Sequence, residues 1–219
     1  MKKFFPACAL VLFFLAASPA LAERPWHELS LRGCAGSVFN AGKVDARDGY
    51  NSLSMGGDLQ WGVGLILTPD NAYEFELAYS QWNGEGNQYS SSGASKIAVD
   101  LKNKQGSLTF RRKYAYPGMF VPWWGVGPDL VFLESTELET IQPGGDLHNK
   151  DMVERTYTGA GAHLCGGFDV YPVKYSSLAL SVEARYSYYA VGNSFIGDIN
   201  GFAAFIGLRW DFWQHSNLD

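Results

Sequence analysis

The sequence is short of three things: long apolar runs, net positive charge and cysteine. After residue 22 it has no run approaching the about 20 apolar residues that a membrane-spanning helix needs, which excludes a helical membrane protein. Its 17 Lys and Arg against 22 Asp and Glu leave a formal charge of −5. Because nucleic acid requires a basic surface, we expect no nucleic-acid partner.

Cysteine is scarce, and no cysteine closely follows the point where an N-terminal leader would be removed. Of the three cysteines, only Cys34 and Cys165 lie beyond residue 22. A lipoprotein anchor is therefore not indicated.

The N-terminus has the pattern of a secretory signal peptide. Lys2 and Lys3 precede an apolar stretch over 4–17, and the small residues at 20 and 22 form a cleavage site. A signal anchor is the alternative, but Pro6 interrupts a stretch already short of a membrane-spanning helix. We expect residues 1–22 to be removed on export, which changes the formal charge from −5 to −7 because Lys2 and Lys3 are lost.

Eight segments alternate apolar and polar residues with a period of two, as strands do when their two faces meet different surroundings. Trp61, Val63 and Leu65, for example, alternate with Gly62 and Gly64. The segments are residues 26–40, 55–67, 73–80, 107–111, 120–132, 157–170, 178–188 and 202–212.

The connections between these segments alternate in length. Short, turn-rich connections cover 68–71, 115–119 and 172–177, and longer ones cover 42–53, 83–96, 135–154 and 191–200. The Ser-rich stretch 87–95 and the acidic stretch 134–154 are expected to be mobile surface loops. Short turns on one side and long loops on the other are typical of outer-membrane barrels, with both chain ends on the periplasmic side.

A soluble β-sandwich is the alternative, but its polar face should carry Lys, Glu and Thr evenly. Here the polar face concentrates glycine and a few charges, while aromatics lie near the ends of the apolar face, as Tyr73, Tyr186 and Trp210 do. The sequence therefore predicts an all-β fold, an eight-stranded antiparallel up-and-down transmembrane β-barrel. Residues 23–219 form this domain, with a short polar tail from about 213.

Two stretches carry a family resemblance. Pro122-Trp123-Trp124-Gly125-Val126-Gly127 resembles the Pro-aromatic-x-Gly-x-Gly strand of small outer-membrane β-barrels, the family of the OmpA transmembrane domain and the opacity-type proteins. Gly207, Trp210 and Phe212 are similar to the C-terminal assembly signal of such barrels, except that Phe205 stands where a polar residue is usual and the chain continues past Phe212.

The resemblance implies a monomer in the outer membrane of a Gram-negative-type bacterium. Its partners would be outer-membrane lipid and lipopolysaccharide and, during biogenesis, the barrel-assembly machinery and periplasmic chaperones.

Alternation also assigns a set of charged residues to the barrel interior. An eight-stranded barrel is only just wide enough for its side chains, so these charges must pair with one another. We expect a salt-bridged lumen; a narrow passive or gated pore is the alternative. The set is Glu28, Arg32, Asp58, Glu74, Glu76, Arg111, Asp129, Asp169, Glu183, Arg185, Arg209 and Asp211.

Nothing in the sequence has the spacing of a catalytic site. A lipid A-modifying enzyme needs a base beside its nucleophile, and no His-x-Ser pair places the two on one strand face. His163 and Cys165 share a face, but we interpret them as interior filler. We therefore expect no catalytic residues, cofactor or metal, and a structural or surface-interaction role.

Cys34 and Cys165 should both face inward, three strands apart around the barrel. In a barrel of roughly 16 Å diameter their Cα atoms would be about 15 Å apart. A disulfide needs less than about 7 Å, so we predict two free, buried thiols.

Overall fold

The computed structural model describes residues 28–39, 42–44, 53–55, 59–69, 72–89, 95–114, 119–141, 148–172, 176–191 and 199–213. The predicted signal peptide lies outside these ranges, as do Asp58 and the tail after Trp213. The strands are β1 Glu28–Phe39, β2 Gly42–Val44, β3 Leu53–Met55, β4 Leu59–Thr68, β5 Tyr73–Tyr89, β6 Ser95–Lys113, β7 Phe120–Ile141, β8 His148–Val170, β9 Leu178–Val191 and β10 Ile199–Trp213. No helix in these ranges is long and apolar enough to cross a membrane.

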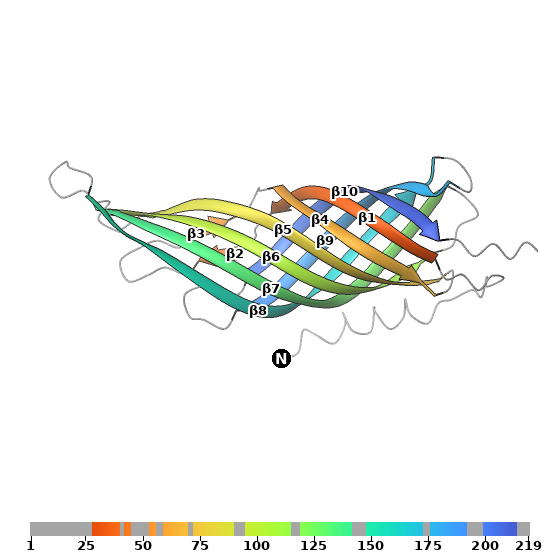
Figure 1. The fold of residues 1–219 in the computed structure, drawn as a ribbon, viewed down its shortest axis with the longest axis horizontal. Coiled ribbons are helices and arrows are strands. Elements are labelled where there is room, and N and C mark those ends of the chain that lie inside the picture. The colour runs from red at the N-terminus through yellow and green to blue at the C-terminus, as the bar shows by residue number, and fades with distance from the viewer. Residues whose placement is uncertain are drawn as a thin grey trace, which may run out of the picture.

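Eight strands form a closed antiparallel barrel in the order β1-β10-β9-β8-β7-β6-β5-β4, which confirms the predicted fold class (Figure 1). The first and last barrel strands close it, with Cys34 opposite Gly207. The backbones come close here, because a Cβ added to Gly36 would lie 1.9 Å from the Ala204 carbonyl oxygen. Glycine at position 36 therefore allows β1 and β10 to approach closely at the seam, the junction where these two strands close the barrel.

The barrel wall has two chemically different faces, as the alternation predicted. Leu65 and Leu77 point outward and are exposed, whereas Gln60, Glu76 and Arg111 point inward and are buried. Because successive strand residues face opposite sides, each strand contributes to an apolar outer band and a polar interior at once.

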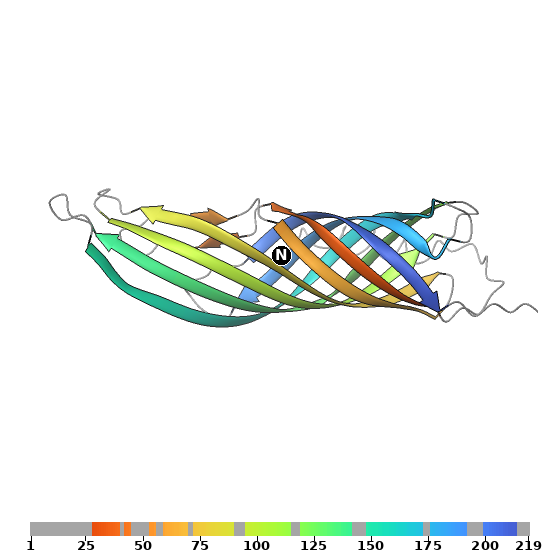
Figure 2. The same cartoon turned by 45° about the horizontal axis from the view of Figure 1, so that its top comes forward.

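Four strands are much longer than predicted. β5, β6, β7 and β8 have 17, 19, 22 and 23 residues, against 12, 10, 14 and 15 for β1, β4, β9 and β10. The expected loops 83–96 and 135–154 were therefore wrong in large part: the strands continue to Tyr89 and Ile141 before turning back. The four strands extend past the others as a curved sheet (Figures 1 and 2). We call this the extended end and the opposite side the turn end.

The outer face of these long strands changes from apolar to polar along their length, and on β6 the inner face changes from polar to apolar. Nearer the turn end, outward residues are apolar, as Phe75 and Leu77 are. Toward the extended end Ile97, Val99 and Leu101 instead point inward and are buried. This reversal explains why the extension was mistaken for loops: the outward residues there are polar, and on β6 alternation continues with the faces exchanged.

Polar residues cover the outer face of the extension. Lys104 pairs with Glu134 across β6 and β7, and the hydrogen bond from Lys104 lowers the pKa of Glu134. Glu85, Asp100 and Glu154 are also exposed there. This outer face has the composition of a surface in water.

The small sheet of β2 and β3 lies within the predicted long connection 42–53 and just beyond it. Met55, expected to begin the second barrel strand, belongs to β3, and that barrel strand begins at Leu59. β3 contacts β5, and β2 contacts β10. The small sheet therefore lies beside the opening of the barrel at the extended end.

Candidate functional site: the barrel lumen

The turn end of the lumen contains a charge cluster centred on Arg209. Its Nη1 lies 2.6 Å from Glu74 Oε1 and 3.2 Å from Asp169 Oδ2, and its Nε lies 2.7 Å from Asp211 Oδ1. Lys113 Nζ also contacts Glu74 Oε1, at 2.9 Å. Three carboxylates thus share two cations, and we call this group the lower cluster.

Hydroxyl groups complete the lower cluster. Ser30 donates to Asp211 Oδ1 at 2.6 Å, and Tyr171 donates to Asp211 Oδ2 at 3.0 Å. Arg209 in turn donates to the Ser30 hydroxyl at 3.1 Å. Because Arg209, Glu74 and Asp169 have no solvent exposure, these contacts replace part of their hydration, while Glu74 Oε2 and Asp169 Oδ1 have no hydrogen-bond partner among the described residues.

A second group, the upper cluster, joins two carboxylates to three arginines. Arg32 contacts both Glu76 and Glu183, with Arg32 Nη2 2.7 Å from Glu76 Oε1. Arg111 also bonds both carboxylates, and Arg185 Nε lies 2.8 Å from Glu183 Oε1. The upper cluster has one excess cation and the lower cluster one excess carboxylate, so their charges balance overall.

Thr109, Asp129 and His163 form a separate hydrogen-bonded group. His163 Nδ1 lies 2.8 Å from Asp129 Oδ1, and Nε2 lies 2.9 Å from the Thr109 hydroxyl. The order acid, histidine, hydroxyl is that of a nucleophilic triad. All three side chains are buried, and none of them lines a cavity described in this part of the chain. Each ring nitrogen of His163 thus has a buried hydrogen-bond partner.

His163 and Cys165 make their hydrogen bonds to other residues rather than to each other. Both ring nitrogens of His163 have partners, and the Cys165 thiol donates to the Gly125 carbonyl at 3.5 Å. Alternation placed Asp129 and His163 inside, but did not show that β6, β7 and β8 bring Thr109 to the same point.

An apolar layer lies in the lumen toward the extended end. Val38, Trp82, Ala203 and Phe205 are buried together, with Cys34 packed against them. Sequence reasoning missed this layer, although Phe205 was noted as an apolar residue in a polar position. That departure from the polar pattern was the signal that could have predicted the layer, because an aromatic side chain that points inward fills the lumen.

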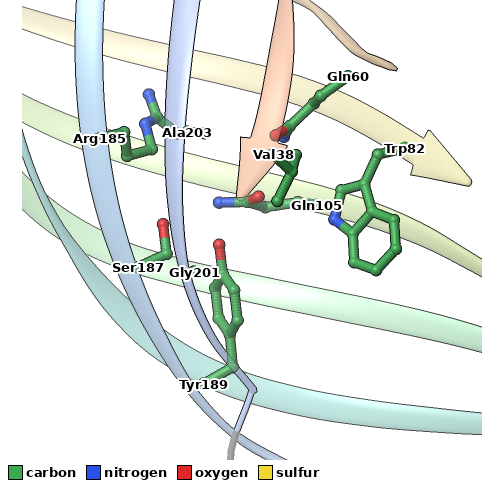
Figure 3. Close-up of a pocket in the computed structure, with 9 residues that line it drawn as sticks. All are labelled: Val38, Gln60, Trp82, Gln105, Arg185, Ser187, Tyr189, Gly201 and Ala203. Carbon is green, nitrogen blue, oxygen red and sulfur yellow. The ribbon is translucent and has the colours of Figure 1, made fainter. Parts of the chain in front are cut away.

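Little open volume remains beside this layer. Trp82 borders a cavity of about 20 Å³. Gln60, Gln105 and Tyr189 lie around it (Figure 3). A second cavity beside Arg32 measures about 10 Å³. Because one water needs about 10–15 Å³ by this measure, each holds about a single water.

Ten of the twelve predicted interior charges are buried in the lumen, in the clusters described above. Glu28 belongs to β1, but its side chain lies outside the described part, as does all of Asp58. Among the residues described, no three His, Cys, Asp or Glu side chains converge as a metal site requires.

The proposed assembly-signal residues all lie on β10. Trp210 and Phe212 point outward, with their ring centroids 5.6 Å apart. Gly207 faces the lumen, where a Cβ would lie 2.3 Å from the Gly33 carbonyl oxygen.

Cys165 is buried and Cys34 only half-buried, and both thiols are free. The prediction of two buried thiols is therefore wrong for Cys34, whose partner across the seam is Gly207, a residue with no side chain to cover the thiol.

No protein-family model and no curated protein matches the sequence. Two solved structures are similar: Neisserial surface protein A, with 14% identity over 84% of this chain and 97% of that one, TM-score 0.51, and OprG from Pseudomonas aeruginosa, with 15% identity over 85% and 96%, TM-score 0.52. The likeness confirms the fold of small eight-stranded outer-membrane barrels.

Proposed function

We propose that this chain is an outer-membrane protein of a Gram-negative-type bacterium whose barrel anchors a binding surface outside the cell. The binding surface is the curved sheet formed by the ends of β5 to β8. The proposal assigns the turn end to the periplasm and the extended end to the exterior. It assigns neither transport nor catalysis to the lumen.

The reversal of face polarity carries this proposal. A transmembrane strand needs about 9–11 residues, so roughly ten residues of β7 and β8 exceed what a bilayer requires. At about 3.3 Å per residue, the excess extends about 30 Å along each strand. Outward apolar residues suit lipid, and the outward charges beyond them suit water.

The composition of the outer face supports binding rather than passive spacing. A short loop could have closed each hairpin. The longer strands order many more residues, at a cost of about 1–2 kcal/mol for each, so we infer that the extension serves a purpose. The mixed charges at Glu85, Asp100, Lys104 and Glu154 suit a polar partner. The charged edge of β8 also resists uncontrolled strand pairing.

The dense lumen supports assigning no transport. Steady conduction requires a continuous water path, and the cavities beside Trp82 and Arg32 hold about one water each. In planar bilayers we expect no steady channels at neutral pH. Regular single-channel steps would contradict the closed lumen and favour a pore instead.

Site-specific labelling tests the orientation. In a C34S/C165S background, Thr136→Cys on intact cells should react with a membrane-impermeant maleimide. Leu130→Cys, six residues away on the same strand and face, should not react until the membrane is dissolved. Equal labelling of both positions on intact cells would contradict the assigned boundary.

Cell adhesion tests the binding surface. A variant whose β5–β6 and β7–β8 hairpins are shortened by removing 85–99 and 136–154 should still assemble, judged by different gel migration before and after boiling. We expect cells carrying it to lose adhesion to immobilised glycans, matrix proteins or other cells that the full protein provides. Undiminished adhesion would contradict the proposal.

A further inference from the structure

Neutral side chains cross the lumen on the extended side of the two charge clusters. On β5, Trp82 lies nearer the extended end than Glu74 and Glu76, and on β10 Phe205 lies nearer that end than Arg209. Trp82 and Phe205 are 5% and 6% exposed. We call this level of the lumen the neutral belt. Its inward side chains are Val38, Gln60, Trp82, Gln105, Tyr189, Ala203 and Phe205.

Every strand of the barrel takes part at the level of the neutral belt. The side chains of the belt come from β1, β4, β5, β6, β9 and β10. On β7 the buried Val131 lies directly opposite Gln105. On β8 the position is taken by Gly161, and the ring of Tyr189 covers it, because a Cβ on Gly161 would lie 2.5 Å from Tyr189 Cδ1. The belt therefore extends around the whole wall.

Hydrogen bonds join the polar members of the belt across three strands. Gln60 Nε2 donates to Ser80 Oγ at 2.8 Å, and Ser80 Oγ donates to Gln105 Oε1 at 3.4 Å. The Gln105 amide points toward the Tyr189 hydroxyl (Figure 3), and Gln105 Nε2 has no hydrogen-bond partner among the described residues. Both residues line the cavity of about 20 Å³, so one water there can bridge them. A single enclosed water is not a path for ions.

The belt and the charge clusters should resist ions to different degrees. Arg32 bonds both Glu76 and Glu183, so one contact can open while the other persists. An ion in the clusters meets charged groups that replace part of its hydration. Beside Trp82 an ion would lose its water and find no charged group within the belt, which is why apolar constrictions exclude water and ions.

We infer that the neutral belt seals the lumen toward the extended end, and that Trp82 and Phe205 are its sealing side chains. This assigns a role to the aromatic residue at 205, which departs from the polar pattern of its neighbours on β10. The ion pairs then stabilise the barrel, and the belt keeps solutes out of it. The inference holds whichever side of the membrane the extended end faces.

A thiol placed just below the belt tests the seal. Ser107 lies two residues from Gln105 toward the turn end and is 3% exposed. The reporter is Ser107→Cys in the C34S/C165S background, in the full chain folded in detergent micelles, where both ends of the barrel meet the reagent. We expect the reporter to react with aminoethyl methanethiosulfonate far more slowly than after boiling in dodecyl sulfate. Equal rates in the folded and boiled samples would overturn the seal.

Two matched pairs of variants locate the sealing side chains. Trp82→Ala removes a buried, inward indole, and Trp61→Ala removes an exposed, outward one from the neighbouring strand β4. Trp82→Ala should make the reporter react about tenfold faster, as for an access barrier about 1.4 kcal/mol lower, and Trp61→Ala should leave the rate unchanged. Phe205→Ala and its outward control Phe202→Ala, both on β10, form a second pair with the same expectation.

Each outcome decides for or against the seal. Assembly of every variant is judged by different gel migration before and after boiling, and where Trp82→Ala does not assemble, the pair at Phe205 and Phe202 decides. Equal reporter rates within an assembled pair would overturn the sealing role. Because no cell or bilayer enters this test, its failure leaves the proposed binding surface untouched, and failure of the adhesion test leaves the seal untouched.

Discussion

Replacing Arg209 by methionine tests whether the lumen is held by paired charges. Arg209 is fully buried and bonds Glu74, Asp169 and Asp211. Without it, three carboxylates share Lys113 as their remaining cation in the lower cluster. Removing one partner of a buried ion pair typically costs about 3–5 kcal/mol, so we expect Arg209→Met to lower the free energy of unfolding by about that amount.

The assay is urea-induced unfolding in lipid vesicles, followed by tryptophan fluorescence and by migration of unboiled samples on gels. Combining Arg209→Met with Glu74→Gln should cost about 1–3 kcal/mol less than the sum of the two single changes, because the second removes one of the three carboxylates that then have Lys113 as their remaining cation. Lys104→Met, which breaks the exposed pair with Glu134, is the control and should leave the unfolding midpoint almost unchanged.

Two results would refute the reasoning. One is a shift for Arg209→Met no larger than that for Lys104→Met, which would mean that water already solvates the lower cluster. The other is strict additivity with Glu74→Gln, which would mean that the two side chains do not interact in the folded protein.

Two further predictions concern the seam and the thiols. Gly36→Ala places a Cβ 1.9 Å from the Ala204 carbonyl oxygen, so little heat-modifiable protein should form, whereas Gly33→Ala, with open space around its Cβ, should assemble normally; equal assembly of both would contradict the close seam. Under non-reducing denaturing conditions, Cys34 and Cys165 should both react with a thiol reagent, and mass spectrometry showing a disulfide between them would contradict the free thiols.

Much of the fold could be predicted because each strand displays its two environments locally. Leu65 and Gly64 are neighbours on opposite faces, and no knowledge of other strands is needed to separate them. The extension was missed for the same reason: at Val99 and Leu101 the apolar residues turn inward, and the pattern resembles neither a lipid-facing strand nor a uniform loop.

The lumen was predictable as a set of residues but not as a set of contacts. Alternation placed Arg32 and Glu183 inside, yet they are distant in sequence and bond only because β1, β10 and β9 are adjacent in the closed barrel. The apolar layer at Trp82 and Phe205 likewise depends on the register between strands.

The sequence by itself determined which side of the wall each membrane-band residue faces, since side-chain direction alternates along a strand whatever its neighbours are. Only the tertiary structure decided which charges pair, how far β5 to β8 extend, and how little space the lumen keeps. Those properties depend on strand register and ring closure, which are set by hydrogen bonds between segments far apart in the chain.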